Sequence, residues 1–295
     1  MVAVSCYRLC KRVEDVGPLG RPEKSRADPT VSQRGEVRPY RDDDAYLLRF
    51  LRARRSIPAR AHRLAIQSGR VSCAVLYIYF GCVQMVRYYA FRAQNEPLWR
   101  DVDAFGLARL GRLYEGVLYD RPDVGRLIIL RIAEWDLNEI SIEDVAQGGL
   151  CLLEVGIMSP RLQVLGGTCL IDCEGLTMRH VRQYTPSIAM QFINIMGLSF
   201  PLHQRGMHVI NCSRIFETFF HFFKRLAPAD DLWKHVHFHG YDLNSLHRYI
   251  DPECLPKRYG GHRESVSLET WLNKIKYYKN EEFDKDMRNL GYYVK

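Results

Sequence analysis

The stretch GMHVINCSRIFETFFHFFKRLA, residues 206–227, joins a predicted buried strand to a helix that carries five phenylalanines. Four of the phenylalanines follow the i, i+3, i+4, i+7 spacing of one helix face, namely Phe216, Phe219, Phe220 and Phe223. A stripe of this kind is typical of a helix that packs on a protein core, and also of a helix that covers a ligand site. Composition alone does not choose between these two interpretations.

The segments around this stretch alternate between strand and helix patterns. The predicted strands lie at 126–135, 167–175, 206–213 and 236–240, with a possible fifth at 255–261. The predicted helices lie at 141–159, beyond Pro186 and at 214–227, and Ser141 is a candidate N-cap. This order predicts an α/β fold in which helices pack on a mostly parallel sheet.

The part of the chain before residue 110 has a different character. Residues 1–40 combine prolines and charged residues without a sustained apolar period, which predicts a flexible leader. Residues 41–55, RDDDAYLLRFLRARR, place acidic residues in a first helical turn and an apolar stripe behind them. This second pattern predicts an amphipathic helix.

Residues 65–84, AIQSGRVSCAVLYIYFGCVQ, interrupt the helical pattern. The uncharged run between Arg70 and Arg87 is shorter than the roughly 20 apolar residues that a membrane span needs. Removing 65–84 restores one continuous amphipathic helix, which predicts that this segment is an atypical insertion. A hairpin that contacts a membrane is the alternative.

Charge is distributed unevenly along the 295 residues. The formal net charge is +8, but residues 1–64 hold 15 of the 42 Lys and Arg and only 8 of the 34 Asp and Glu, which leaves 27 and 26 for the rest of the chain. A nucleic-acid binder concentrates basic residues on its folded recognition face. We therefore expect no nucleic-acid partner, whereas the basic leader suits contact with anionic lipid.

The nine cysteines do not form a disulfide framework. They lie at 6, 10, 73, 82, 151, 169, 173, 212 and 254, without a CxxC pair or regular spacing. The N-terminus also lacks the apolar run of a secretory signal. Free thiols in a reducing compartment are the expected state.

Motifs for catalysis and metal binding are scarce. The GxSxG, HExxH, GxGxxG and P-loop patterns do not occur in the sequence. His235, His237 and His239 fall on one face of a predicted strand, where they form either a metal site or ordinary hydrogen bonds. Asp172 and Glu174 are either a carboxylate pair or the end of a strand before a turn. The sequence therefore favours a protein that is not an enzyme and holds no cofactor and no metal.

Seven short motifs follow one another between residues 47 and 261. They are LLRFLRAR (47–54), RIAEWD (131–136), IDCEG (171–175), TPS (185–187), SFPLHQRGMHVIN (199–211), HFHG (237–240) and LPKRYGG (255–261). In this order they resemble the CRAL-TRIO lipid-transfer family, within it the branch of tocopherol-transfer, clavesin and retinaldehyde-binding proteins. The resemblance implies a small all-helical N-terminal subdomain followed by an α/β cage, a mostly parallel sheet flanked by helices, which encloses one hydrophobic molecule.

This resemblance completes the expected organisation of the chain. A flexible basic leader is expected at 1–40, and the helical subdomain, with the atypical insertion, at 41–110. The CRAL-TRIO lipid-binding domain is expected at 111–262, and a helical tail at 263–295.

The resemblance also implies which residues contact the ligand. The positions that line the family's chamber fall on Gly149, Leu153, Gly167, Ile171, Phe192, Ile195, Met196, Phe200 and Leu202. The positions of Gly149 and Leu153 are serines in the tocopherol binder. The resemblance therefore implies a drier chamber and a ligand with fewer hydroxyl groups, because an unpaired buried hydroxyl costs about 1–3 kcal/mol.

In this family the helix that corresponds to Arg214–Leu226 is a mobile gate over the chamber. The gate residues implied here are Ile215, Phe216, Phe219, Phe220 and Phe223. The resemblance thus gives the aromatic stripe two roles. It lines the chamber when the gate is shut, and it contacts a membrane when the gate opens.

The family also binds phosphoinositide headgroups through a basic cluster beside the gate. The resemblance assigns this role to His203, Arg205, Lys224, Lys234 and His235. Two of these positions carry histidine in place of a stronger base, and Asp231 stands where a further base is expected. Because histidine carries only partial charge at neutral pH, bisphosphate binding is expected to be weaker and to strengthen on acidification.

Together these expectations describe a cytoplasmic monomer that associates transiently with membranes. We expect it to bind a single tocopherol-, retinoid- or phospholipid-like molecule and to carry this molecule between membranes without covalent chemistry. Anionic membrane surfaces and phosphoinositides are its expected partners. The alternative is a phosphoinositide-sensing adaptor in membrane trafficking, and a hydrolase built on the same sheet is a third hypothesis.

Overall fold

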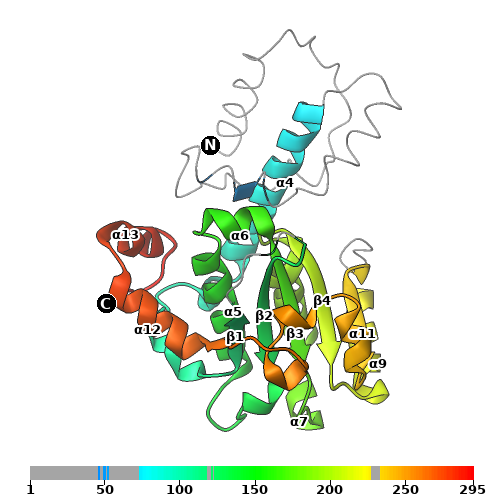
Figure 1. The fold of residues 1–295 in the computed structure, drawn as a ribbon. Helices are drawn as coiled ribbons and strands as arrows, with labels where there is room; N and C mark the ends of the chain where they lie inside the picture. The colour runs from blue at the N-terminus through cyan, green and yellow to red at the C-terminus, as the bar shows by residue number, and fades with distance from the viewer. Residues whose placement is uncertain are drawn as a thin grey trace. The chain divides into compact units, whose positions relative to one another are not determined.

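The computed structural model describes residues 46, 49, 50, 52, 73–117, 121, 123–226 and 233–295. The chain divides into two compact units, Met1–Gln94 with Ser199–Pro201, and Asn95–Leu198 with Leu202–Lys295. Figure 1 labels their helices and strands. Among the described residues, no helix combines the length and the apolar character that crossing a bilayer requires.

The first unit is built around α4 (Cys73–Gln94). Aromatic rings pack edge to face on this helix, with centroids 5.9 Å apart for Phe50 and Tyr88 and 5.7 Å apart for Tyr88 and Phe200. Gln84 is buried in the same region, and its Nε2 donates a hydrogen bond to the carbonyl oxygen of Phe200 at 3.0 Å. This bond satisfies a polar side chain inside an apolar cluster.

The second unit contains a six-stranded sheet in the order β5-β4-β3-β2-β1-β6. The strands are β1 (Tyr114–Val117), β2 (Arg126–Arg131), β3 (Gly167–Asp172), β4 (Gln204–Ile210), β5 (Val236–Gly240) and β6 (Val266–Ser267). Strands β2 to β5 run parallel to one another, whereas β1 is antiparallel to both β2 and β6. The predicted α/β fold with a mostly parallel sheet is therefore confirmed.

Helices connect the parallel strands, as crossovers between parallel strands require. The α-helices of this unit are α5 (Ile142–Gly156), α6 (Pro160–Leu165), α7 (Met178–Val181), α8 (Pro186–Ile193), α9 (Arg214–Leu226), α11 (Leu243–His247), α12 (Leu268–Tyr278) and α13 (Glu281–Asn289). Short 3-10 helices are η1 (Glu96–Leu98), η2 (Gly106–Leu110), η3 (Ile132–Glu134), η5 (Pro252–Cys254) and η6 (Lys257–Tyr259), and a π-helical turn, η4 (Asn194–Leu198), follows α8. The predicted N-cap of α5 is confirmed, since the amide of Asp144 donates to Ser141 Oγ at 3.1 Å.

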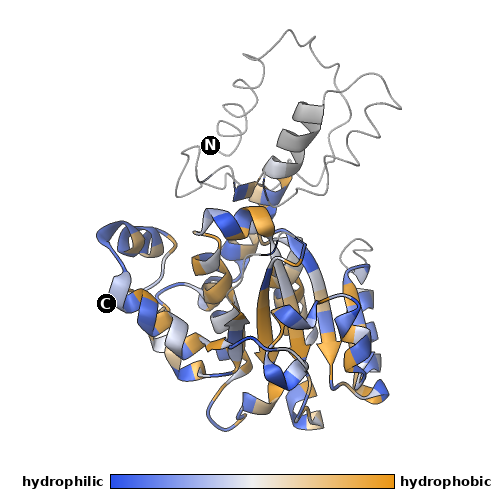
Figure 2. Ribbon diagram, in the orientation of Figure 1, coloured by the Kyte–Doolittle hydropathy of each residue, from blue (hydrophilic) through white to orange (hydrophobic). Residues whose placement is uncertain are grey.

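The two faces of the sheet are covered by different helices. On one face, Leu127, Ile129 and Leu170 belong to a buried cluster with residues of α11 and of the turns η5 and η6. On the other face, side chains of β2 to β5 face α8 and α9. Figure 2 shows that the strands in the middle of the sheet are largely apolar, whereas α12 and α13 alternate between polar and apolar residues. This pattern is expected for a sheet that is buried on both faces.

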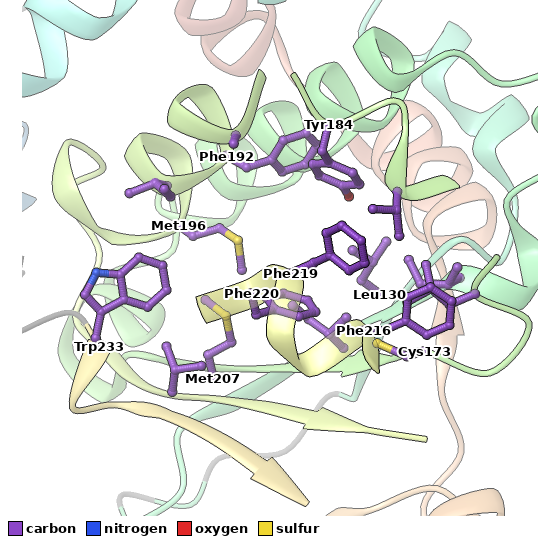
Figure 3. Close-up of a pocket in the computed structure, with 17 residues that line it drawn as sticks. Leu130, Cys173, Tyr184, Phe192, Met196, Met207, Phe216, Phe219, Phe220 and Trp233 are labelled. Atoms are coloured by element: carbon purple, nitrogen blue, oxygen red, sulfur yellow. The ribbon is translucent and has the colours of Figure 1, made fainter. Parts of the chain in front are cut away.

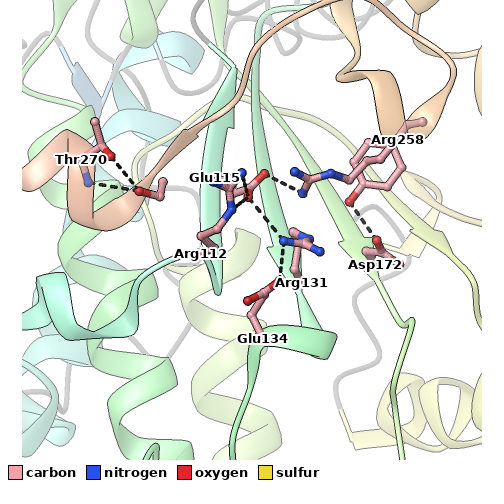
Figure 4. Close-up of polar contacts among 9 residues, drawn as sticks. Arg112, Glu115, Arg131, Glu134, Asp172, Arg258 and Thr270 are labelled. Carbon is pink, nitrogen blue, oxygen red and sulfur yellow. Dashed lines mark hydrogen bonds and ion pairs between the residues drawn. The ribbon is translucent and has the colours of Figure 1, made fainter.

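A buried carboxylate ties β1 to its neighbours. Glu115 is fully buried, and its two carboxylate oxygens accept hydrogen bonds from Arg112 Nε and Arg258 Nη1, each at 2.9 Å. Nη1 of Arg131 lies 3.5 Å from Glu115 Oε1 (Figure 4). A carboxylate is stable in such a place only where charged and hydrogen-bonding partners replace water. The cluster therefore joins β1, β2 and η6.

Asp172 holds the carboxyl end of β3. Its Oδ1 accepts hydrogen bonds from Asn211 Nδ2 at 2.7 Å and from the amide of Glu174 at 3.1 Å, and its Oδ2 accepts one from the Tyr259 hydroxyl at 2.8 Å. Glu174 is exposed, and Gly175 has a φ of +74° in the turn that follows. The interpretation of Asp172 and Glu174 as a strand end before a turn is confirmed, and the carboxylate pair is wrong.

Some predicted strands differ from the observed ones. The possible strand at 255–261 is wrong, because this segment contains η6 (Lys257–Tyr259), which is followed by Gly260 with a φ of +79°. Proline and glycine at its two ends favour a turn over a strand. Strands β1, with four residues, and β6, with two, were not predicted, since neither is long enough for a clear alternation.

Two predicted segments in the first unit are described only in part. Of the helix predicted at 41–55, the described residues Tyr46, Arg49, Phe50 and Arg52 are helical. Helix α4 includes residues 73–84, so a hairpin over these residues is wrong. The origin of 65–84 as an insertion stays a prediction.

Candidate functional site

The aromatic stripe lies on α9, with one face toward the sheet. Phe216, Phe219 and Phe220 are half-buried, whereas Thr218 is exposed and Ile215 is 71% exposed. The helix therefore presents phenylalanines to the protein interior, whereas Thr218 and the apolar Ile215 face solvent. The side chain of Phe223 lies outside the described residues.

A cavity with a volume of about 110 Å³ lies between α9 and the sheet. Its lining comes from β2 to β5, from the segment 173–184, from α8 and the π-helical turn, and from α9 and Trp233. Figure 3 shows the rings of Phe216, Phe219 and Phe220 in the space between the sheet and α8, with Phe216 on the side of Cys173. The phenylalanine stripe thus forms one wall of the cavity.

An unfilled apolar cavity leaves its lining side chains without packing partners on one side. The cavity observed here is also smaller than the roughly 300–1,000 Å³ of sites that hold drug-sized ligands. Because three of the lining rings come from a single helix, an outward movement of α9 enlarges the cavity without disturbing the sheet.

The structure brings some of the predicted ligand-contacting residues together at this cavity. Ile171, Phe192 and Met196 line it, and so do Phe216, Phe219 and Phe220 of the predicted gate. The predicted residues that are not part of its lining are Gly149, Leu153, Gly167, Ile195, Phe200, Leu202 and Ile215. A Cβ atom on Gly167 would lie 3.5 Å from Leu202 Cδ2, so these two residues pack on each other at the start of β3.

Gly149 packs against a buried tyrosine. A Cβ atom on Gly149 would lie 2.9 Å from Tyr114 Oη, and the Tyr114 hydroxyl donates a hydrogen bond to the carbonyl oxygen of Val145 at 2.7 Å. Burial raises the pKa of Tyr114 well above its usual value, so this group stays a neutral donor. Glycine at this position therefore has a packing reason, since a serine would collide with the hydroxyl.

The described lining residues offer few polar groups. These are the thiol of Cys173, the hydroxyl of Tyr184 and the indole of Trp233. Burial raises the pKa of Tyr184 above its usual value, which keeps its hydroxyl neutral. A lining of this kind suits an apolar molecule with few hydrogen-bonding groups.

Four of the predicted headgroup residues lie at the amino ends of two neighbouring parallel strands. We call His203, Arg205, Lys234 and His235 the basic edge. The first two are at the start of β4, and the last two directly precede β5. The amide of Met207 in β4 donates to the carbonyl oxygen of His235 at 2.8 Å. This hydrogen bond holds the start of β4 beside the segment that precedes β5. Lys234 and His235 are exposed.

The predicted headgroup residues differ in their surroundings. Arg205 Nη1 donates to the carbonyl oxygen of Asp123 at 2.8 Å and its Nε donates to that of Leu165, so this side chain also fixes the strand end. Lys224 is exposed near the end of α9. Asp231 lies outside the described residues.

A histidine cluster occupies the sheet face opposite the cavity, since strand side chains alternate and Met207 and Val236 line the cavity. His208 Nδ1 lies 2.9 Å from His239 Nε2, and the rings of His208 and His237 stack with centroids 5.2 Å apart. Among the described residues, no group of three or more His, Cys, Asp or Glu is arranged to hold a metal ion. His237 and His239 therefore belong to a packed, hydrogen-bonded cluster.

This cluster gives the fold a predicted dependence on pH. Burial lowers the pKa of His208 to about 3, and the neighbouring His239 and His237 lower it as well. In the unfolded chain a histidine titrates near 6.5, so below that pH the unfolded chain binds a proton that the folded chain does not. We expect the free energy of unfolding to fall by about 1.4 kcal/mol for each pH unit below about 6.5 from His208 alone.

Denaturant unfolding between pH 7.5 and 4.5 measures this slope. The variant His208→Gln is expected to have a shallower slope than the unmodified protein. His262→Gln, which changes an exposed histidine, is the control and is expected to keep the original slope. Equal slopes in His208→Gln and the unmodified protein contradict the prediction.

The sequence analysis missed several residues of the cavity. Leu130, Met207 and Val236 lie on the same sheet face as Ile171, and the alternation within the strands carries this signal once the register is known. Tyr184 precedes the TPS motif in a turn. No periodicity indicates its position.

The chain is similar in sequence to several known proteins. A family model described as the CRAL/TRIO domain matches residues 118–261. Clavesin-1 of Rattus norvegicus is 32% identical over 247 residues, which are 83% of this chain and 64% of that protein. Clavesin-1 of Xenopus laevis is 31% identical, with 83% of this chain and 69% of that protein covered. Clavesin-2 of Homo sapiens is 29% identical, with coverages of 87% and 72%.

The match to rat clavesin-1 thus spans somewhat less than two thirds of that protein's length. Among solved structures, the crystal structure of Sfh5 aligns with a TM-score of 0.47 and 13% sequence identity. This alignment covers 78% of this chain and 77% of the other.

Proposed function

The chain belongs to the CRAL-TRIO family, and from this premise we propose that it is a carrier of one hydrophobic molecule between membranes. The observation that supports this proposal most directly is the apolar cavity closed by the phenylalanine face of α9. Residues 111–262 hold the ligand in this proposal, and the segments 41–110 and 263–295 flank them. The role requires no covalent step.

The proposed mechanism uses α9 as a gate with two positions. In the proposed closed position Phe216, Phe219 and Phe220 cover the cavity, and their place in its lining supports this role. In the open position the same rings enter the boundary between lipid headgroups and acyl chains. Because a buried phenylalanine contributes about 1.5–3 kcal/mol, the stripe stabilises either position, and a membrane changes the balance between them.

The ligand class follows from the chemistry of the lining. Among the described lining residues, three side chains carry polar groups, so most of the cavity surface is hydrocarbon. A molecule with many hydroxyl groups would lose hydrogen bonds to water on entry, at about 1–3 kcal/mol for each unpaired group. We therefore propose a lipid with at most a few polar groups, of a tocopherol-, retinoid- or phospholipid-like kind.

The experiment for this function is the recovery of a ligand. The full-length protein is incubated with total cell lipid extract and reisolated, and the bound molecules are identified by mass spectrometry. The same molecules, with a fluorescent label, are then followed between donor and acceptor vesicles. We expect one class of apolar lipid to copurify and to move faster with protein than without. An empty protein that moves no lipid contradicts the carrier proposal.

We further propose that the basic edge, together with Lys224, contacts phosphoinositide headgroups on the membrane. Lys234 and His235 are exposed beside the half-buried His203, and Lys224 is exposed at the end of the gate. Each basic residue near an anionic surface contributes about 1 kcal/mol to membrane binding. Because an imidazole adds positive charge only when it is protonated, we expect this binding to strengthen on acidification.

Charge reversal at the basic edge tests this contact. Lys234→Glu is expected to weaken binding to vesicles that contain phosphatidylinositol bisphosphate about fivefold or more, and lowering the pH from 7.5 to 6 is expected to strengthen binding of the unmodified protein. Lys285→Glu, an exposed residue of α13 with the same charge change, is the control and is expected to bind normally. Equal losses in both variants indicate a general charge effect. Vesicle binding without lipid transfer supports the adaptor hypothesis instead.

A further inference from the structure

Two cysteines lie beside each other at the carboxyl ends of β3 and β4. The ends of these parallel strands, Asp172 and Ile210, are register partners, and the amide of Cys173 donates to the carbonyl oxygen of Ile210 at 3.0 Å. Cys212 follows Ile210 by two residues. The sulfur atoms of Cys173 and Cys212 are within hydrogen-bonding reach of each other. Continuing this register by one residue places Cys173 opposite Asn211, the residue directly before Cys212.

This pair connects the cavity to the start of the gate. Cys173 lines the cavity, and Figure 3 shows it beside Phe216, which lies in the first turn of α9. Cys212 precedes Arg214, the first residue of α9, by two positions. A bond between the two sulfur atoms would therefore fix the amino end of the gate to the cavity wall.

Cys212 differs from Cys169 and Cys173 in the direction of its pKa shift. The hydrogen bond with Cys173 lowers the pKa of Cys212, and the same hydrogen bond, together with burial, raises the pKa of Cys173. Burial raises the pKa of Cys169 to about 12. Because the thiolate is the nucleophile, Cys212 is the more reactive partner and Cys173 is placed to complete a disulfide.

We propose that Cys173 and Cys212 form an oxidation site, at which hydrogen peroxide converts the two thiols to a disulfide that holds the gate closed. The disulfide rests only on the paired cysteines, whereas its effect on ligand exchange rests on the carrier function proposed above. Both cysteines are 4% exposed, so the reaction requires a brief opening at the start of α9. Such an opening is what ligand exchange through the gate also requires.

Hydrogen peroxide accepts the two electrons that the two thiols lose when the disulfide forms. The thiolate of Cys212 attacks one peroxide oxygen and the O–O bond breaks, which gives a sulfenic acid on Cys212 and, after protonation, one water molecule. The sulfur of Cys173 then attacks the sulfur of Cys212, the S–O bond breaks, and the oxygen leaves as a second water molecule. Two thiols have then lost two electrons and two protons to hydrogen peroxide. A dithiol reductant reverses the reaction.

The test combines a peptide map with two measurements on the gate. The full-length protein is treated with hydrogen peroxide and digested without reduction, and the linked peptides are identified by mass spectrometry. Hydrogen–deuterium exchange of the α9 peptide and lipid transfer between vesicles are measured before oxidation, after oxidation and after dithiothreitol. We expect the 173–212 linkage, slower deuterium uptake in α9, and lipid transfer at least threefold slower, with recovery of both rates after reduction.

Matched variants assign the effect to this pair. The Cys212→Ser variant is expected to keep its deuterium uptake and transfer rate when it is treated with peroxide. The Cys169→Ala variant, which changes a cysteine on β3, is expected to respond to peroxide like the unmodified protein. If Cys212→Ser does not fold, the linkage in the unmodified protein still decides the chemistry. Peroxide treatment that leaves 173 and 212 unlinked overturns the proposal, and so does a linkage that leaves α9 exchange unchanged. Absence of lipid transfer in the reduced protein rejects the carrier function instead.

Discussion

Replacing Phe219 with aspartate is expected to slow lipid transfer between vesicles at least tenfold. Phe219 lines the cavity from the middle of α9, between Phe216 and Phe220 on one face of that helix. A carboxylate at this position must either enter an apolar cavity without a partner or enter the apolar part of a membrane, and both are unfavourable by several kcal/mol. The variant thus disfavours the closed and the open positions of the gate together.

Thr218→Asp provides the matched control for the gate. Thr218 is the preceding residue of the same helix, but its side chain is exposed on the other face, so the same charge stays in water. We expect Thr218→Asp to transfer lipid within twofold of the unmodified protein. Thermal melting of each variant shows whether it is folded. Equal transfer by the Phe219→Asp variant and the unmodified protein would contradict a gate role for α9.

The sequence predicts the four parallel strands and helix α9 because their signals are local. Helix α9 begins at Arg214, as predicted, and the core strands appear as short apolar runs. The cavity is less predictable, because its walls come from distant segments. Leu130 and Met207 meet only after β2, β3 and β4 pair in one register, and a single-residue shift would turn both side chains to the other face.

The ligand-contacting residues that were assigned from the family resemblance are only partly found at the cavity. Ile171 and Met196 line the cavity, whereas Gly149 packs against Tyr114 and Leu202 packs against Gly167. A match of motifs transfers the backbone position of a residue, but the direction and size of neighbouring side chains decide what it contacts. The Tyr114 hydroxyl fills the space beside Gly149 here, and no motif in the sequence carries that information.

Replacing the buried Glu115 with glutamine is expected to lower the free energy of unfolding by about 3 kcal/mol. Removing one partner from a buried ion pair typically costs about 3–5 kcal/mol, since the remaining charges stay uncompensated. The lower end applies here, because the side chains of Arg112 and Arg258 are 50% and 32% exposed and regain some hydration. The side chain of Arg131, at 14% exposed, has the least access to water.

The measurement is denaturant unfolding of the Glu115→Gln variant beside Glu96→Gln. Glu96 pairs with Arg100 four residues later, and both side chains are about half exposed, so its loss is expected to change stability by less than about 0.5 kcal/mol. The same Glu→Gln change thus compares the loss of unfolding free energy at a buried charge cluster with the loss at a solvated ion pair. Similar small effects in both variants would mean that water already screens the Glu115 cluster. The attachment of β1 to β2 and η6 would then depend on strand hydrogen bonds and apolar packing instead of on this carboxylate.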